Sequence, residues 1–357
     1  MSASHLKLTF YFTERQRAGS QFLAESMLDL FTERGIAGSV MLRGIAGFGH
    51  RGFISSDEKL TLSEDPSVTI EAIDTEEAIG DLADDVTEMM SSGLVTLQRA
   101  TLLGSDPTAV SMGDGDDQVK MTIYVSRSRR INDSPAYYAI CDLLYRHHFD
   151  GATVLLGVDG TSYGIRRRAH FFGRNLDVPL MIIAVGSTAH VRQVIPALAA
   201  LPHRPLITTE RLRVCKRDGR LMAGPLALSV RDDRGRPLWQ KLMVHTTEAT
   251  LHDGVPIHRA LVRKLSESGI TTGATVVRGV WGFHGDHEPH GDRLIQFGRQ
   301  VPVLTIIIDT PERISRSFGI VDELTGTHGL VTCETVPALL ALDDGERHGS
   351  IDLADFH

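Results

Sequence analysis

Three short sequence patterns recur in the same order three times along the chain, and this repetition constrains the fold more than any other feature. The first pattern is a strand-like run with a lysine near its start, the second an apolar run between two glycines, and the third an apolar run leading into a turn. They start at Leu6, Val119 and Gln240, at Gly38, Gly151 and Gly273, and at Ser67, Pro179 and Pro302. The spacing agrees to within about one residue, which predicts three copies of one domain of about a hundred residues.

Hydrophobic spacing predicts the elements of each unit. Between the first two patterns the first unit carries a helical apolar stripe, formed by Leu23, Met27, Leu30 and Phe31. After the third pattern, Asp74 and Glu77 resemble a capping box that starts a second helix. A short run, Leu94 to Thr96 in the first unit, closes each copy. The order strand, helix, strand, strand, helix, strand predicts an α+β fold of ferredoxin-like modules, each with two helices on one face of an antiparallel sheet.

The other face of each predicted sheet also needs to be buried. Thr305 to Ile308 place apolar side chains on both faces of one strand, which indicates packing against sister modules rather than water. We therefore expect an intramolecular pseudo-trimer that is monomeric as a whole chain. The predicted modules span 1–104, 118–215 and 239–341, with linkers at 105–117 and 216–238, and we expect a frayed acidic tail over 342–357. The second linker is expected to form a hairpin around Asp218 and Gly219.

Composition excludes several classes of protein. The formal net charge of −8 argues against broad binding to nucleic acid or an anionic membrane, which needs clustered Lys and Arg. The absence of a long apolar run or secretory leader pattern predicts a cytoplasmic protein. Three widely separated cysteines predict reduced packing residues. No nucleophile elbow, metalloprotease or Walker motif is present, so we expect no enzymatic activity.

The loop between the second and third strands is long and differs most between the units. In the first unit it begins Arg43-Gly44-Ile45-Ala46-Gly47-Phe48-Gly49, and in the third Arg278-Gly279-Val280-Trp281-Gly282-Phe283. Glycines let a backbone approach a ligand closely, and an arginine pairs with phosphate or carboxylate. The alternative is that the glycines set a tight turn while Phe48 and Phe283 fill a core.

Three segments together support a resemblance: the Arg-Gly-x-x-Gly-Phe loop base, the run SEDPSVTIEAIDTEE from Ser63, and GLVTLQ from Gly93. They resemble the PII-like family catalogued as domain of unknown function 190. The match covers nearly all of the first unit, most of the third, and only the framework of the second. The resemblance implies trimers of ferredoxin-like subunits with a signalling loop after the second strand, whose relatives bind nucleotides or small anions between subunits.

Transferred to this sequence, the resemblance implies ligand contacts in two of the three loops. The implied residues are Arg43, Gly44, Gly47, Phe48, Gly49 and Lys59 in the first unit, and Arg278, Gly279, Gly282, Phe283 and Arg293 in the third. The second unit departs from the pattern, with Leu156 in the place of the arginine and Thr161 in the place of the phenylalanine. Its loop instead carries Arg166, Arg167 and Arg168, a run more typical of a solvated loop face than of a phosphate site.

The third loop also contains His284, Asp286, His287, Glu288 and His290, which are ligand types suited to zinc or copper. A flexible polar loop is the alternative interpretation. The sequence thus predicts a non-enzymatic PII-like sensor of a small ligand, with a nucleotide as the implied class and a membrane transporter or channel as the implied partner. The second hypothesis is a metal-binding protein that uses His284, His287 and His290.

Overall fold

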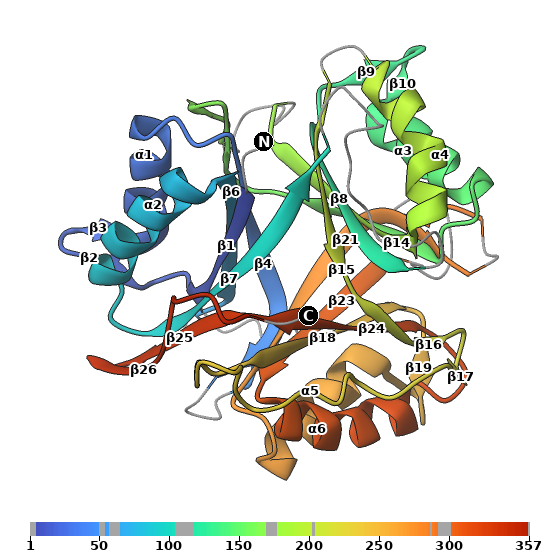
Figure 1. Cartoon of the computed structure of the whole chain (residues 1–357). Helices are drawn as coiled ribbons and strands as arrows, with labels where there is room; N and C mark the ends of the chain where they lie inside the picture. Colours follow the sequence, from blue (N-terminus) through green and yellow to red (C-terminus); the bar gives the residue numbers. More distant parts are fainter. Residues whose placement is uncertain are drawn as a thin grey trace.

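The computed structural model describes residues 5–49, 54–56, 65–103, 117–168, 177–201, 204–285, 288–291 and 301–355. Within these residues the chain forms three units that each contain four principal strands and two helices, as Figure 1 shows. The first unit contains β1 His5–Thr13, α1 Leu23–Glu33, β4 Gly38–Phe48, β6 Ser67–Thr75, α2 Glu76–Met89 and β7 Gly93–Leu102. The second contains β8 Gln118–Ser126, α3 Ala136–Arg146, β11 Gly151–Leu156, β14 Pro179–Ser187, α4 Thr188–Ala199 and β15 Leu206–Arg211. The third contains β18 Trp239–Thr247, α5 Ile257–Ser268, β21 Ala274–His284, β23 Pro302–Asp309, α6 Pro311–Leu324 and β24 Leu330–Val336.

Every unit pairs its strands in the same antiparallel order. The first unit has the order β4–β6–β1–β7, the second β11–β14–β8–β15 and the third β21–β23–β18–β24. A two-stranded hairpin precedes the first helix of each unit: β2 Arg17–Ala18 with β3 Gln21–Phe22, β9 Arg130–Ile131 with β10 Ser134–Pro135, and β19 Leu251–His252 with β20 Val255–Pro256. The order of elements predicted from the repeat is therefore present in all three copies.

Each helix pair covers one face of its own sheet. The buried stripe of α1 consists of Leu23, Ala24, Met27, Leu28 and Phe31, close to the predicted one. The cap of α2 differs from the prediction, because Thr75 is the N-cap and accepts a hydrogen bond from the backbone N–H of Ala78. Asp74 instead accepts hydrogen bonds from the backbone N–H groups of Ala37 and Thr75, which ties the helix start to β4.

The second face of each sheet is buried where the units meet. One apolar cluster draws on all three units, including Val40 and Leu42 of β4, Ile183 of β14, and Leu304 and Ile308 of β23. Figure 1 shows the three helix pairs on the outside, with the strands converging toward the middle. The expected burial of both sheet faces is confirmed. Cys141, Cys215 and Cys333 are free and buried, as predicted.

Strands also continue from one unit into the next. Beyond Arg43, β4 leaves β6 and pairs with β21 of the third unit. Beyond Arg278, β21 leaves β23 and pairs with β11 of the second unit. Residues after β11 return to the first unit, where Asp159 bridges to Met41 and β12 (Thr161–Ser162) bridges to β4. The three second strands thus interlock in a cycle.

The chain at the end of each unit pairs with the last strand of another unit, and these pairings form a second cycle. The end of β7 pairs with β15, β16 (Arg213–Arg217) pairs with β24, and β25 (Ala338–Asp343) pairs with β7. The expected hairpin at Asp218 and Gly219 is present, since β16 pairs with β17 (Arg220–Leu221) and both turn residues have positive φ.

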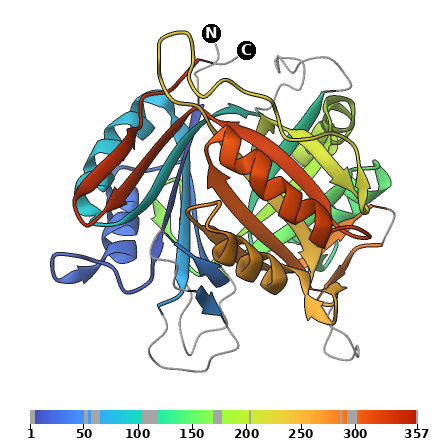
Figure 2. The same cartoon turned by 90° about the horizontal axis from the view of Figure 1, so that it is seen from below.

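The expectation of a frayed tail over 342–357 is wrong for the described residues. β25 forms a hairpin with β26 (Glu346–Ser350), and Figure 2 shows these red strands lying against the blue first unit. Leu342 is buried in the core of the first unit, and the Asp355 carboxylate accepts a hydrogen bond from Arg236 at 2.6 Å. The hairpin forms because β7 offers an unpaired edge that the tail completes.

Candidate functional site

The two predicted ligand arginines lie where a second strand passes from its own sheet to that of a neighbour. Arg43 is the last residue of β4 that pairs with β6, and Gly44 already pairs with Val277 of the third unit. Arg278 holds the same place on β21, before Gly279 pairs with the second unit. These two boundaries, here called the loop bases, are the candidate site.

Each loop-base arginine forms an ion pair with a glutamate of its own unit. Nη2 of Arg43 lies 2.6 Å from Oε2 of Glu14, and Nη2 of Arg278 lies 2.6 Å from Oε2 of Glu248. The arginine side chains are 55% and 34% exposed, so solvent reaches both guanidinium groups. The residues that the repeat placed in register therefore do carry equivalent charged pairs, although the sequence did not indicate their glutamate partners.

The second unit has lost both members of this pair. The backbone N–H of Glu14 donates to Pro66, that of Glu248 to Val301, and that of Arg127 to Val178, which shows that the three positions are equivalent. In the second unit, Leu156 stands at the position that Arg43 and Arg278 hold in the other two units. The second loop base therefore has no cation on β11 with which to bind an anion.

The loop-base glycines are explained by close contact between units. A Cβ on Gly47 would lie 2.5 Å from the carbonyl oxygen of Ala274, and one on Gly282 would lie 2.2 Å from that of Ala152. Both oxygens belong to a strand of the neighbouring unit. Gly44 and Gly279 are similarly crowded, by Ser67 and by Val154 with Pro302, whereas nothing lies within 4 Å of a Cβ on Gly49. Contact with a neighbouring strand therefore restricts Gly47 and Gly282 most, whereas Gly44 is crowded chiefly by Ser67 of its own unit.

Phe48 and Phe283 are enclosed in the cores of neighbouring units. Phe48 is 9% exposed and packs in the core of the third unit, while Phe283 is 3% exposed and packs in that of the second. The Phe283 ring meets Tyr145 of α3 edge to face, with centroids 5.4 Å apart. This burial favours the packing alternative for both rings, and their ligand contacts stay a prediction.

In the arginine run of the second loop, Arg167 and Arg168 are exposed, as predicted for a solvated loop face, but the run also forms ion pairs with the first unit. Arg166 forms ion pairs with Asp159 at 2.7 Å and with Asp29 of α1 at 2.5 Å. Arg168 pairs with Glu25 of α1 at 2.6 Å. These contacts fasten the second unit's loop to a helix of the first, so the loop that lost its arginine–glutamate pair serves as a connection between units.

The remaining predicted residues are only partly described. Lys59, Arg293 and His287 lie outside the described residues. The rings of His284 and His290 are 6.1 Å apart across β21 and β22 (His290–Gly291), and Nδ1 of His284 lies 3.8 Å from Oδ1 of Asp218. Within the described part of the chain, no three or more His, Cys, Asp or Glu side chains are arranged to hold a metal ion.

A buried cluster of charges links all three units and was not assigned a role from the sequence. The lysine near the start of each first strand reaches the last strand of the next unit: Lys7 lies 2.6 Å from Glu210, Lys120 lies 2.7 Å from Glu334, and Lys241 donates to Gln98 at 2.7 Å. Glu71 adds a third carboxylate, 3.5 Å from Lys7. We call these seven residues the central cluster, in which three ammonium groups face three carboxylates.

Burial and charge act against each other in the central cluster. Burial alone would lower the pKa of Lys7, but the Glu210 and Glu71 carboxylates outweigh it and raise the pKa to about 12. Burial lowers the pKa of Lys241 to about 8, and repulsion by Lys120 and Lys7 adds to this shift, which the Glu334 carboxylate only partly opposes. Its partner in the next unit is an amide, Gln98, where the other lysines meet a carboxylate. A lysine recurring inside an apolar strand was the available signal for this cluster.

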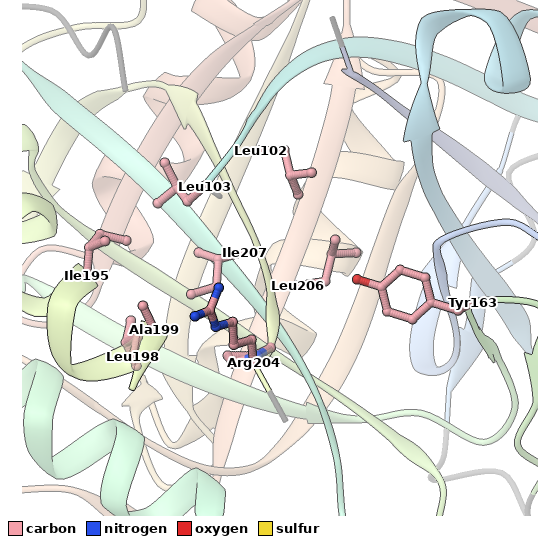
Figure 3. Close-up of a pocket in the computed structure, with 10 residues that line it drawn as sticks. Leu102, Leu103, Tyr163, Ile195, Leu198, Ala199, Arg204, Leu206 and Ile207 are labelled. Atoms are coloured by element: carbon pink, nitrogen blue, oxygen red, sulfur yellow. The ribbon is translucent and has the colours of Figure 1, made fainter. Parts of the chain in front are cut away.

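A shallow pocket of about 170 Å³ lies where the end of β7 meets α4 and β15. Figure 3 shows Arg204 beside Leu198, Ala199 and Ile207, with Tyr163 farther along the same opening. None of the residues predicted to bind a ligand lines this pocket. None of the described helices is both long enough and apolar enough to span a membrane.

Comparison with known proteins identifies the repeated unit. The family model of domain of unknown function 190, described as "Uncharacterized ACR", matches three separate segments, residues 5–102, 118–214 and 239–338. The UPF0166 protein of Aquifex aeolicus (strain VF5) is 33% identical over 99 residues, which cover 28% of this chain and 90% of that protein. A solved structure titled "Crystal structure study of anthrone oxidase-like protein" aligns over 59% of this chain and 92% of its own, with 12% identity and a TM-score of 0.18, too low to support any argument. The chain therefore belongs to the PII-like family catalogued as domain of unknown function 190, whose domain it carries in three tandem copies.

Proposed function

We propose that this protein is a non-enzymatic PII-like regulator that binds a small anion at the loop bases of its first and third units. The anion class that we favour is a nucleotide, as the family resemblance implies. Two equivalent, solvent-accessible guanidinium groups at boundaries between units are the observation that carries the proposal. Binding would order the attached loop and present it to a partner protein, and the family resemblance suggests a transporter or channel.

The proposed architecture is a covalent pseudo-trimer of ferredoxin-like modules over 1–104, 118–215 and 239–341. The shared strand order and the two cycles of strand pairing support it. In this arrangement one chain supplies the three modules that a trimeric protein assembles from three chains. We therefore expect the purified protein to be a monomer, and we expect it to be cytoplasmic in the cell. Light scattering coupled to gel filtration tests this, and an obligate trimer of whole chains would contradict it.

Calorimetric titration with ATP and ADP tests the ligand proposal. We expect saturable binding to the wild-type protein and its loss in the double variant Arg43→Ala/Arg278→Ala, because each substitution removes the cation of one loop base. Arg34→Ala is the matched control, since Arg34 is a similarly exposed arginine in an ion pair with Asp85 on the surface of the first unit. Equal binding by the double variant and the control would contradict the assignment of the loop bases.

The second candidate function is zinc binding by the loop of the third unit. The neighbouring rings of His284 and His290, which lie nearly perpendicular to each other, and the nearby Asp218 carboxylate favour it, and His287 of the same loop would be a further ligand. Zinc titration of the wild-type protein and of His284→Ala/His290→Ala tests it. Unchanged zinc affinity in the double variant would remove this candidate.

A further inference from the structure

We propose that Glu14 and Glu248 are resident competitors, carboxylates that hold the loop-base arginines until a ligand of higher negative charge displaces them. The inference rests on the proposed function, because it takes Arg43 and Arg278 as the groups that receive the ligand. It also requires the ligand to carry more negative charge than one carboxylate, as a phosphate chain does.

Both glutamates are held in place by the same local structure. Each follows the last residue of its unit's first strand, and its backbone N–H donates to the chain just before the third strand, at 2.9 Å in both units. The fixed backbone presents each carboxylate to an arginine on the second strand, which pairs with the other side of the third strand, with the same 2.6 Å separation. The pair is therefore a repeated feature of the site and occurs twice in register.

The second unit supplies an independent observation. The position equivalent to Glu14 and Glu248 carries Arg127, and the position equivalent to Arg43 and Arg278 carries Leu156. Both members differ together, so this unit has no arginine on its second strand and no carboxylate beside it, and the exposed guanidinium of Arg127 stands at the glutamate position instead. This joint difference is expected if the glutamate serves to pair with the arginine of the second strand, since without that arginine the carboxylate would have no guanidinium to hold.

The exposure of the pairs suits displacement. Exposed ion pairs contribute little to folding stability, so opening the Arg43–Glu14 pair costs little, whereas the Arg278–Glu248 pair is partly buried, with Glu248 19% exposed, and costs more to open. A monocarboxylate would replace one carboxylate by another and gain nothing from the exchange. A phosphate chain carries several charges and forms paired hydrogen bonds with a planar guanidinium, so it outcompetes the glutamate.

Calorimetric titrations with sodium tripolyphosphate and with ATP, at low ionic strength, test the proposal. Replacing both carboxylates in Glu14→Gln/Glu248→Gln removes the competitor and its repulsion of the incoming anion, and should lower the Kd for either probe by about tenfold. Glu25→Gln is the matched control, because Glu25 forms the same 2.6 Å pair with an arginine away from the loop bases, and should leave the Kd unchanged. Tighter binding of ATP than of tripolyphosphate would show that the nucleoside is also recognised.

The outcomes separate this inference from the proposed function. If Arg43→Ala/Arg278→Ala abolishes binding but the double glutamine variant binds no more tightly than wild type, the competitor role is wrong and the ligand site stands. Saturable binding by the glutamine variant alone would support the competitor role. No binding of either probe by either protein would overturn both, provided that circular dichroism shows the variant to be folded.

Discussion

Replacing Lys120 by methionine tests whether the central cluster holds the three units together. Nζ of Lys120 lies 2.7 Å from Oε2 of Glu334 and 3.6 Å from Oε2 of Glu210, and all three side chains are buried. Methionine has a similar volume, so the main effect is to leave two buried carboxylates short of one cation. Removing one partner of an isolated buried ion pair typically costs about 3–5 kcal/mol, and we expect a loss at or below the lower end of that range because Lys7 stays 2.6 Å from Glu210 and Lys241 stays 3.1 Å from Glu334.

Guanidinium denaturation followed by circular dichroism at pH 7 measures this loss. Lys264→Met is the matched control, since Lys264 forms a 2.7 Å pair with Glu323 but is 40% exposed, and we expect a much smaller shift of its midpoint. The double variant Lys120→Met/Glu334→Leu removes one charge of each sign and should be less destabilised than Lys120→Met alone. Equal midpoints for Lys120→Met and Lys264→Met would refute the reasoning, because burial would then have made no difference.

Three further predictions address burial, backbone contact and protonation. Phe48→Ala should destabilise the protein by about 3–5 kcal/mol in the same denaturation assay, because it empties a site in the core of the third unit; a loss below about 1 kcal/mol would contradict that burial. Gly47→Ala should lower the melting temperature, since its Cβ would lie 2.5 Å from a backbone oxygen, whereas Gly49→Ala, with nothing within 4 Å, should not; similar melting temperatures would argue against the β4–β21 contact. Burial lowers the folded-state pKa of Lys241 to about 8. The unfolded chain therefore binds more protons between that value and the ordinary lysine value of 10.5, and the contribution of Lys241 to stability should rise with pH across this window. Gln98→Glu would supply a carboxylate, raise the pKa of Lys241 and flatten the rise, which denaturation midpoints at pH 7.5 to 10.5 would show; an unchanged slope would exclude Lys241 as its source.

The sequence predicted the elements within each unit because helix stripes and strand runs depend on neighbouring residues. It did not predict the exchange of strands between units, which depends on residues far apart in the chain. Gly47 and Phe48 illustrate the difference: a glycine beside an aromatic residue is typical of a ligand loop, yet here a neighbouring strand and a neighbouring core account for both. The acidic tail was predicted wrongly for the same reason, since Leu342, Ile351 and Leu353 find their partners in the core of the first unit, far away in the chain.

The candidate site was predicted in part. The register of the repeat placed Arg43 and Arg278 at equivalent positions, which the structure shows to be boundaries between units. Their partners Glu14 and Glu248 lie after the first strand, where no motif marked them. Likewise, the lysine in each first strand served only to align the repeats, because a charge in an apolar strand acquires its meaning from the carboxylate that another unit supplies.

The cycle of trailing strands also bears on how many copies of the domain such a chain needs. The end of the first unit lies on β15, that of the second on β24, and that of the third on β7, so each copy receives one strand and donates one. With two copies, one sheet would keep an open edge and one donated strand would have no acceptor. Such a chain would complete itself only by borrowing a domain from another molecule, as exposed strand edges tend to do. With three copies in one polypeptide, every donated strand pairs with an acceptor strand of the same chain.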